Sequence, residues 1–328
     1  MEEYDVILAE AGNKVGRLVK RSLEQLGLHV LICDRREGDV LTLPASDSLN
    51  YALQIKSIAE SCGAGMVIPI FYPEALAAHR ELLGGIILPV DDAATLHTLD
   101  DKLCACALAE SLGILQPHMY TSVDEVDHYP VVFKRTGGHG GDSAYFPKLR
   151  SSLEHLVAAS VPGTYLISDE IDGYDASVDV LRWDGQFCAS AYRVLLPKAK
   201  GVSIMRRSID APELVETARR ILEAVDFRGV CGVDFRVERG SGKAYFLECN
   251  PRFSGGLASA MASGFDIPKY LWMLASGQQV RLPEKPRTGV RTADIADLRG
   301  YLRRRISKRR LNADDILLAL SLPFCKKY

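Results

Sequence analysis

The sequence lacks the features that mark several common classes of protein. Its eight cysteines include no C-x-x-C pair, which argues against a zinc ribbon or a thioredoxin-type motif. No apolar run approaches the ~20 residues that a membrane-spanning helix needs. The net charge is only −2, from 40 basic and 42 acidic residues, so the charge of the whole chain favours neither nucleic acid nor an anionic membrane as a partner.

The N-terminus also lacks the basic and apolar segments of a signal peptide. The first ten residues, "MEEYDVILAE", are acidic and then strand-like. Several of the scattered cysteines lie in apolar runs, where reduced, buried cysteine is common. These features predict a cytoplasmic protein, because thiols stay reduced in that compartment.

What is present is an alternation of strands, helices and glycine turns over 328 residues, long enough for two or three sub-domains. The opening stretch "YDVILAEAGNKVGRLVKRSLEQLGLHVLICD" predicts a strand, a glycine turn, a helix and a second strand. Further along, we expect helices from about 99 to 112 and from 212 to 225. Three strands are expected between 164 and 194, with turns at Asp172-Gly173 and Asp184-Gly185.

The segment "CGVDFRVERGSGKAYFLECN" predicts a β-hairpin whose turn is centred on Ser241. This register places Asp234 opposite Glu248, and Asn250 follows on the same face. Carboxylates with Cβ atoms ~5 Å apart repel each other unless a cation lies between them. Two acids and an amide, without Cys or His, suit Mg²⁺ or Mn²⁺. The hairpin therefore predicts a metal site.

This prediction depends on the register of the hairpin. The same register places Arg236 opposite Phe246, and a single bulge would move Asp234 to the other face. The alternative is a polar hairpin face in contact with solvent. The apolar flanks argue against that alternative, as does Pro251, which ends the strand directly after Asn250.

A candidate phosphate-binding loop lies upstream in "KRTGGHGGDS". A metal held by few protein oxygens usually carries phosphates. Gly137, Gly138, Gly140 and Gly141 allow backbone N–H groups to converge on an anion, and Lys134 adds a positive charge at the end of the preceding strand. The glycines alone are weak evidence, since many such loops simply join strands, and the P-loop ending is absent.

A third polar segment is "ISDEIDGYD". Asp169 and Glu170 follow an apolar strand, and Asp175 comes two residues after Gly173. Carboxylates here could accept hydrogen bonds from an adenine amino group or from ribose hydroxyls. On spacing alone, a solvated turn is the preferred interpretation.

The order of these segments resembles the ATP-grasp superfamily: a lysine before a glycine loop, an acidic hinge, and a hairpin that ends in E-x-N-P-R. "DDKLCACALAESLGILQP" is similar to the family's entry segment, and "NPRFSGG" to the ending typical of its carbamoyl phosphate synthetase-like branch. The resemblance runs from about residue 5 to 280. It implies an α/β protein with the ATP-grasp fold, in which two α+β subdomains grip ATP, preceded by a Rossmann-like parallel α/β domain. The expected divisions are a Rossmann-like domain (1–95), a small or lid subdomain (96–172), a C-terminal subdomain with the metal site (173–289) and a basic helical extension (290–328).

The resemblance also implies roles in nucleotide binding. Lys102 and Lys134 match the two nucleotide-binding cations, and the glycine loop matches a mobile loop that closes over the phosphates. Asp169, Glu170 and Ile171 fall where adenine is read, although a glutamate is common at the first of these positions. Asp175 falls where the ribose is held.

For the reacting end of the site, the resemblance implies metal ligands and phosphate-binding arginines. Asp234, Glu248 and Asn250 match the ligands of two Mg²⁺ or Mn²⁺ ions, with Glu248 bridging them. Arg252 matches the arginine that stabilises the transferred phosphoryl group. Arg206 is the expected further phosphate contact. Three other cations remain alternatives to it: Arg193, Lys198 and Arg207.

The function that the resemblance implies is ATP-dependent ligation of a carboxylate to an amine. The carboxylate would form an acyl phosphate, and the amine would capture it to give an amide or peptide bond, ADP and phosphate. Amino acid-like substrates, no nucleic acid partner and a homodimer are expected. One alternative is a bicarbonate-activating enzyme, as in carbamoyl phosphate or carboxylase chemistry. Another is a non-catalytic ATP-binding module, although the intact set of Lys, Asp, Glu, Asn and Arg residues argues against it.

Two segments lie outside this interpretation. "AEAGNKVG" and Asp34 are where a dehydrogenase would hold a nicotinamide cofactor, but the turn lacks the G-x-G pair that lets a pyrophosphate approach.

Seven of the twelve residues from 299 to 310 are basic. A solvated helix face or a subunit contact is the common explanation for such a run. Docking on an anionic membrane or an acidic partner, with "ILLALSLPF" as an apolar anchor, is the alternative.

Overall fold

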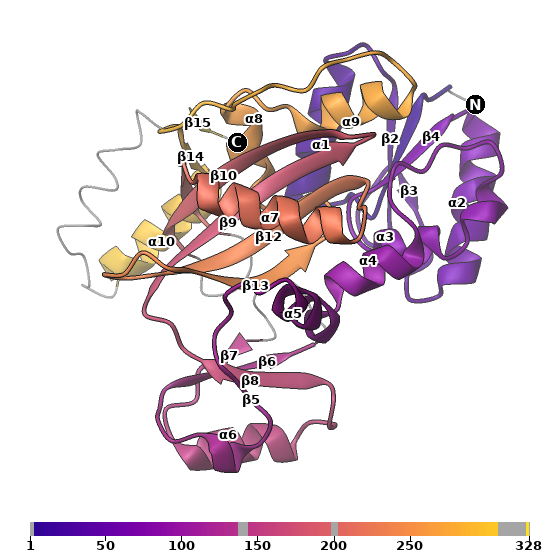
Figure 1. Cartoon of the computed structure of the whole chain (residues 1–328). Helices are drawn as coiled ribbons and strands as arrows, with labels where there is room; N and C mark the ends of the chain where they lie inside the picture. Colours follow the sequence, from indigo (N-terminus) through magenta and orange to yellow (C-terminus); the bar gives the residue numbers. More distant parts are fainter. Residues whose placement is uncertain (1–2, 137–143, 198–202, 308–325, 328) are drawn as a thin grey trace.

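Three β-sheets organise the computed structural model in Figure 1, which describes residues 3–136, 144–197, 203–307 and 326–327. A four-stranded parallel sheet with its helices lies at one end of the view. A seven-stranded sheet crosses the centre, and a smaller four-stranded sheet hangs below it. This arrangement agrees with the expected α/β fold.

The parallel sheet has the strand order β3-β2-β1-β4, and every neighbouring pair in it is parallel. Its strands are β1 (Val6–Ala9), β2 (Val30–Asp34), β3 (Val40–Leu41) and β4 (Met66–Pro69). The helices α1 (Lys14–Glu24) and α2 (Ser48–Cys62) connect them. In β1, Val6 and Leu8 enter one apolar cluster while Ile7 and Ala9 enter another. Both faces of the strand are therefore covered, which explains its continuous apolar run.

The connection to the small sheet is helical, and it differs from the predicted single helix from 99 to 112. Its helices are α3 (Pro73–Ala77), the 3₁₀ helix η1 (Arg80–Leu83), α4 (Ala93–Asp100) and α5 (Lys102–Ser111). The prediction is wrong because Asp101 separates α4 from α5. Its carboxylate accepts hydrogen bonds from the backbone N–H groups of Leu103 and Cys104, both at 3.0 Å, and so caps α5. Lys102 thereby becomes the first residue of a helix.

The small sheet is antiparallel, with the order β5-β8-β6-β7. Its elements are β5 (Met119–Tyr120), the 3₁₀ helix η2 (Val123–Glu125), β6 (Val131–Arg135), β7 (Ala144–Tyr145), α6 (Arg150–Ala158) and β8 (Tyr165–Asp169). Phe133, Leu153 and Ile167 form its own small core with α6. Lys134 lies at the end of β6, next to this core.

The large sheet has the order β13-β12-β9-β10-β11-β14-β15. Its strands are β9 (Gly173–Trp183), β10 (Gln186–Leu196), β11 (Met205–Ser208), β12 (Gly229–Glu238), β13 (Ala244–Asn250), β14 (Arg291–Ala293) and β15 (Lys326–Lys327). All neighbours are antiparallel except β14 and β15, which are parallel. The predicted turn at Asp184-Gly185 is confirmed: the φ angles of 46° and 80° give the type I′ geometry that joins β9 to β10. The predicted turn at Asp172-Gly173 is wrong, because Gly173 already begins β9 and the residues before it connect the small sheet to the large sheet.

The two faces of the large sheet have different coverings. The helix α7 (Pro212–Ala224) covers one face, where it packs with Ala176, Val178 and Val180. The intervening residues Ser177 and Asp179 point to the other face, since side chains alternate along a strand. That second face carries most of the polar residues discussed below.

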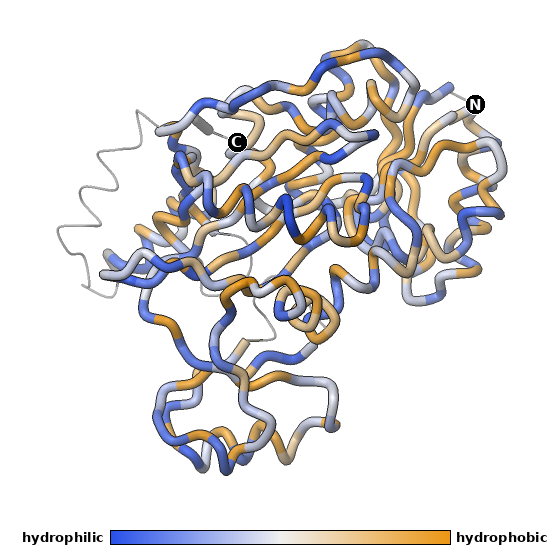
Figure 2. Tube along the Cα trace, viewed as in Figure 1, coloured by the Kyte–Doolittle hydropathy of each residue, from blue (hydrophilic) through white to orange (hydrophobic). Residues whose placement is uncertain are grey.

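The C-terminal part of the chain returns to the large sheet. It forms α8 (Leu257–Ala262), α9 (Ile267–Ala275), β14 and α10 (Ile295–Ser307). The connection before β14, which crosses the top of the view, is largely hydrophilic, whereas the strands of the parallel sheet are mostly hydrophobic (Figure 2). Lys14 of α1 forms ion pairs with Asp294 and Asp297, which ties this segment to the parallel sheet. Within the described ranges, no helix is both long and apolar enough to span a membrane.

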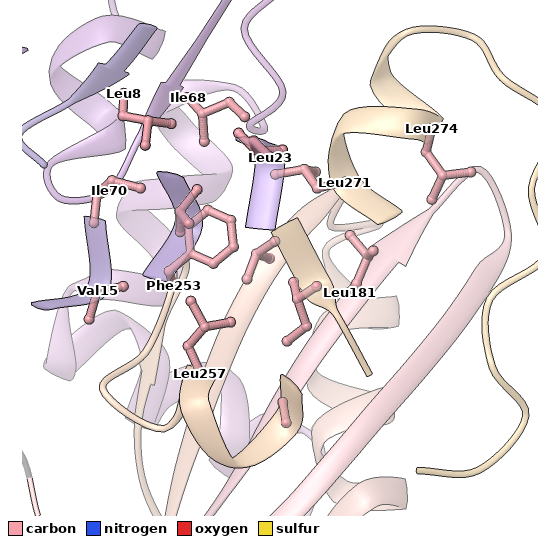
Figure 3. Close-up of a cluster of buried hydrophobic side chains, with 14 of the residues drawn as sticks. Leu8, Val15, Leu23, Ile68, Ile70, Leu181, Phe253, Leu257, Leu271 and Leu274 are labelled. Atoms are coloured by element: carbon pink, nitrogen blue, oxygen red, sulfur yellow. The ribbon is translucent and has the colours of Figure 1, made fainter. Parts of the chain in front are cut away.

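One apolar cluster joins the parallel sheet to the large sheet (Figure 3). Leu8 and Ile68 enter it from the parallel sheet, and Leu181 enters it from β9. Phe253 and Leu271 fill the space between them. The chain segment that follows β13 is therefore anchored by packing at Phe253, directly beside the predicted metal-site hairpin.

Leu181→Ala should lower the free energy of unfolding by about 2–5 kcal/mol, because a buried leucine leaves both transfer free energy and a cavity behind. Urea denaturation measures this change. Leu149→Ala, at a side chain that is 64% exposed, is the matched control and should change stability by less than about 0.5 kcal/mol. Equal effects from the two substitutions would show that the cluster does not hold the two sheets together.

Candidate active site

The hairpin formed by β12 and β13 pairs Asp234 with Glu248, as the sequence predicts. Asn250 lies opposite Gly232, two residues further along the same face. A bulge follows between Asp234 and Phe235 and leaves one extra residue on β13. The predicted pairing of Arg236 with Phe246 is therefore wrong, and Arg236 faces Tyr245 instead.

The two facing carboxylates have opposite electrostatic surroundings. Burial, and then the charge of Glu248, raise the pKa of Asp234 above its ordinary value. Burial alone would also raise the pKa of Glu248, but the positive charges of Lys134, Lys102 and Arg252 lower it. The site therefore concentrates its cations around one of its two acids.

Neutral groups complete the surroundings of Asp234. The Ser177 hydroxyl donates to one carboxylate oxygen, and the Asn250 amide donates to the other at 3.2 Å. Within the described part of the chain, no group of three or more His, Cys, Asp or Glu side chains is arranged to hold a metal ion. The candidate ligand set is thus two carboxylates and one amide. These are oxygen donors that fit Mg²⁺ or Mn²⁺, and a cation between the carboxylates would relieve their repulsion.

The structure brings together cations from three parts of the chain. Lys102, the first residue of α5, has its ammonium nitrogen 3.9 Å from a carboxylate oxygen of Glu248, and it also donates to the backbone carbonyl of Thr136 at 3.2 Å. Lys134 comes from the small sheet and Arg252 from the loop after β13, and both act on Glu248 electrostatically. Lys102 and Arg252 are only 7% and 8% exposed, so these charged side chains are buried next to the predicted metal ligands.

Arg252 is held by an acid that the sequence analysis missed. One guanidinium nitrogen lies 3.2 Å from a carboxylate oxygen of Asp100, at the end of α4. The guanidinium carbon also lies 5.7 Å from the centre of the Phe71 ring, which follows β4. The signal that could have identified Asp100 is its position directly before the Asp101-Lys102 pair.

A second missed residue is Arg236, which fixes the hinge between the small and large sheets. Its side chain donates to the backbone carbonyl of Ile171 at 2.9 Å and to the Asp175 carboxylate at 2.8 Å. Arg236 shares a face with Asp234 two residues earlier, and this alternation could have predicted it. Glu170, beside Ile171, is exposed.

Other predicted residues are only partly placed at the site. The Asp169 carboxylate accepts a hydrogen bond from the Tyr120 hydroxyl at 2.7 Å and lies 3.4 Å from a His128 ring nitrogen, so it is engaged within the small sheet. The glycine loop lies outside the described residues, together with the part of the chain from 137 to 143.

The four cations considered as phosphate contacts are separated by the structure. Arg193 and Arg207 face each other on the side of the large sheet that α7 covers, and both are exposed. Arg206 points to the face that carries Asp234, and it is 1% exposed. Lys198 lies outside the described residues.

The turn after β1 has its own internal contacts, and these argue against a nicotinamide site. The Asp34 carboxylate accepts hydrogen bonds from the backbone N–H groups of Gly12 and Arg36, both at 2.8 Å. Asn13 caps α1 by accepting from Val15 and Gly16. The groups that a dinucleotide would need are therefore occupied by the protein itself.

Comparison with known proteins agrees with this architecture. A family model described as "ATP-grasp in the biosynthetic pathway with Ter operon" matches residues 162–298. The large chain of carbamoyl phosphate synthase from Thermoanaerobacter pseudethanolicus is 24% identical over 286 residues, which cover 80% of this chain and 25% of that relative. The arginine-specific large chain from Bacillus subtilis is 23% identical over 82% of this chain and 26% of its own length. The chain thus spans about a quarter of the length of these relatives.

Solved structures share the fold at low sequence identity. Biotin carboxylase from Campylobacter jejuni superposes with a TM-score of 0.71 at 18% identity, over 88% of this chain and 74% of that one. The L-amino acid ligase from Bacillus licheniformis gives a TM-score of 0.67 at 16% identity, over 84% and 75% of the two chains. Together with the paired carboxylates and their surrounding cations, these matches show that the chain is similar to ATP-grasp proteins over residues 162–298 and shares the fold of these enzymes.

Proposed function

We propose that this protein is an ATP-dependent carboxylate–amine ligase. It would phosphorylate the carboxylate of one small molecule and join the resulting acyl phosphate to the amine of another, releasing ADP and phosphate. The observation that supports this best is the gathering of Lys102, Lys134 and Arg252 around Glu248, which faces Asp234. Buried cations beside paired acids suit a metal–triphosphate complex better than a structural ion pair, because two carboxylates and three cations are more than pairing requires.

Asp234, Glu248 and Asn250 would hold Mg²⁺ or Mn²⁺, two ions by the family pattern. When bound, the metal would neutralise charge on the β- and γ-phosphates and help to align the attacking oxygen. Because phosphoryl transfer needs little covalent chemistry from the protein, positioning and electrostatics supply most of the rate. The remaining residues of the site therefore act chiefly by where they are held.

Lys102 and Lys134 would bind the phosphates from the α5 and small-sheet sides. Arg252, fixed by Asp100, would stabilise the transferred phosphoryl group and the acyl phosphate. On the nucleotide side, Arg236 orients the Ile171 carbonyl and the Asp175 carboxylate, the groups proposed to contact adenine and ribose. Glu170 and Asp169 are also proposed to contact adenine, and Arg206 is proposed to contact a phosphate. A loop that closes over the phosphates would exclude water from a hydrolysable intermediate.

Bicarbonate activation is a second candidate, and the known relatives favour it. Several matches are carbamoyl phosphate synthase large chains, and one solved neighbour is a 2-oxoglutarate carboxylase domain in complex with MgADP and bicarbonate. The L-amino acid ligase, whose TM-score of 0.67 is similar to the 0.70 of that carboxylase domain, favours the carboxylate–amine reaction instead. ADP formation that depends on bicarbonate, without any added amino acid, would select the second candidate.

We also propose small-molecule, amino acid-like substrates and a homodimer. The solved biotin carboxylase domain of the Hydrogenobacter thermophilus 2-oxoglutarate carboxylase, which shares the fold, is a dimer. Docking of the basic tail on an acidic partner or a membrane surface stays a prediction, and most of that tail lies outside the described residues.

The main test is a screen of pooled acids and amines with Mg²⁺ and ATP, with ADP release and the mass of the condensed product as readouts. Glu248→Gln should lower the rate of ADP formation by about 100-fold or more, since it removes a predicted metal ligand. Glu238→Gln, on the same hairpin near its turn, is the control and should leave the rate unchanged. ATP binding by the wild-type protein without any ADP release across the pool would favour a non-catalytic module.

Asp100→Asn should lower kcat about tenfold, because a neutral acceptor holds the Arg252 guanidinium less firmly by roughly 1.4 kcal/mol. The KM for ATP should stay the same, since Asp100 lies on the reacting side of the site. Steady-state kinetics with the substrates found in the screen measure both constants. Asp92→Asn, at the other end of α4, is the matched control. An unchanged kcat in Asp100→Asn would contradict the positioning role.

A further inference from the structure

An acid that has no role in the chemistry proposed above lies close to Arg252. Glu74 is the second residue of α3, which begins two residues after Phe71, whose ring centre lies 5.7 Å from the Arg252 guanidinium carbon. Pro69, at the end of β4, and Leu96 of α4 line the same small cavity as Arg252. The turn from β4 into α3 is therefore at the reacting end of the candidate site.

The packing of α3 on α4 places Glu74 next to Asp100. The two helices are in contact (Figure 1), and Ala77 of α3 belongs to the same apolar cluster as Leu96 and Leu99 of α4. Residues three or four apart share one face of a helix. Glu74 is three residues before Ala77 and so lies on the face of α3 that meets α4. Asp100 is four residues after Leu96 and lies on the face of α4 that meets α3.

Two acids thus share one arginine at this end of the site. Arg252 is paired with Asp100 at 3.2 Å, whereas Glu74 forms no ion pair with any residue that the structure describes. Glu74 is half-buried. Burial raises its pKa most, and the charge of Asp100 also raises it, against the opposing charges of Arg252 and His97. Glu74 is therefore a partly accessible carboxylate that binds a proton more readily than an ordinary glutamate.

The remaining side of α3 is apolar. It packs on α2, where Tyr51 lies in the same cluster as Ala75 and Leu76. The charges that act on Glu74 therefore come from α4 and from the loop that carries Arg252.

The proposed reaction needs a proton acceptor that the other site residues do not supply. An aliphatic amine is mostly an ammonium ion at neutral pH, and it cannot attack a carbonyl carbon until it loses a proton. The two lysines and Arg252 are cations. Asp234 and Glu248 are the proposed metal ligands, and Asp100 holds Arg252. A further acid near Arg252 would complete the site.

We propose that Glu74 binds the ammonium group of the amine substrate and accepts the proton that this group must lose. The inference rests on the proposed function, because it takes Arg252 as the contact of the acyl phosphate. Glu74 would hold the amine beside the carbonyl carbon. After one proton has passed to Glu74, the nitrogen lone pair forms the C–N bond and the C–O bond to the phosphate breaks. The second proton leaves the nitrogen with the departing phosphate, as hydrogen phosphate.

The test separates the two halves of the reaction with hydroxylamine, which is mostly unprotonated at neutral pH and reacts with an acyl phosphate without a base. With pooled acids, Mg²⁺ and ATP, the wild-type protein should form hydroxamate from hydroxylamine and amide from the pooled amines. Glu74→Gln should keep the rate of hydroxamate formation within about twofold, since that product requires only the acyl phosphate. Its rate of amide formation should fall about 100-fold or more, the usual contribution of a general base.

Glu81→Gln is the matched control, because Glu81 is an exposed glutamate in η1, directly after α3. It should leave both rates unchanged. Equal losses of hydroxamate and amide formation in Glu74→Gln would show that Glu74 only supports the structure around Arg252. Unchanged amide formation would show that the amine does not use it. Either result overturns the inference.

A second variant keeps the test decisive if Glu74→Gln does not fold. In Glu74→Ala, added formate can occupy the vacated space and act as the base. Formate should raise amide formation by this variant at least about tenfold and should leave that of the wild-type protein unchanged. Absence of rescue would overturn the inference.

The inference and the proposed function fail in different ways. A wild-type protein that forms neither hydroxamate nor ADP with any acid would overturn the ligase proposal, and the role of Glu74 with it. Hydroxamate formation by the wild-type protein, with amide formation that does not depend on Glu74, would overturn the inference alone.

Discussion

The facing pair of Asp234 and Glu248 is the constraint on which the rest of the structure depends. Two buried carboxylates on adjacent strands repel each other, and the structure answers by placing cations around one of them. Lys102 comes from a helix, Lys134 from the small sheet and Arg252 from the loop after β13. Bringing these three together requires α5, the small sheet and the large sheet to meet at this hairpin. The packing of these elements therefore also sets the charge distribution of the site.

The asymmetry of the pair has a functional consequence. The cations lower the pKa of Glu248, while Asp234 has hydroxyl and amide partners and a raised pKa. A divalent cation between them would supply charge where the protein supplies least. Arg252 is held in a similar way on the other side of the site, where Asp100 and Phe71 keep the guanidinium in place. The side chains that are proposed to act in the reaction are thus held in place by residues of other helices, strands and loops.

Much of the site could be predicted from the sequence because it is local. The pairing of Asp234 with Glu248 follows from strand alternation and turn position. The pairs nearest the turn are shifted by one residue from the predicted register, and the bulge on β13 restores that register at Asp234. Arg236 lies between the turn and the bulge, where the one-residue shift is not yet compensated, so its predicted partner was wrong. The helix expected from about 99 to 112 began too early, because Asp101 fits a helix by composition yet caps α5 in the structure.

The sequence by itself determined the strand order along the chain, the paired acids of the hairpin and the family resemblance, because each depends on residues within one segment. Only the tertiary structure decided that Asp100 holds Arg252, that Arg236 orients the hinge, and that Glu74 of α3 lies close to Arg252. These contacts join residues far apart in the sequence. They arise from how the packed sheets and helices meet, and local periodicity carries no information about that.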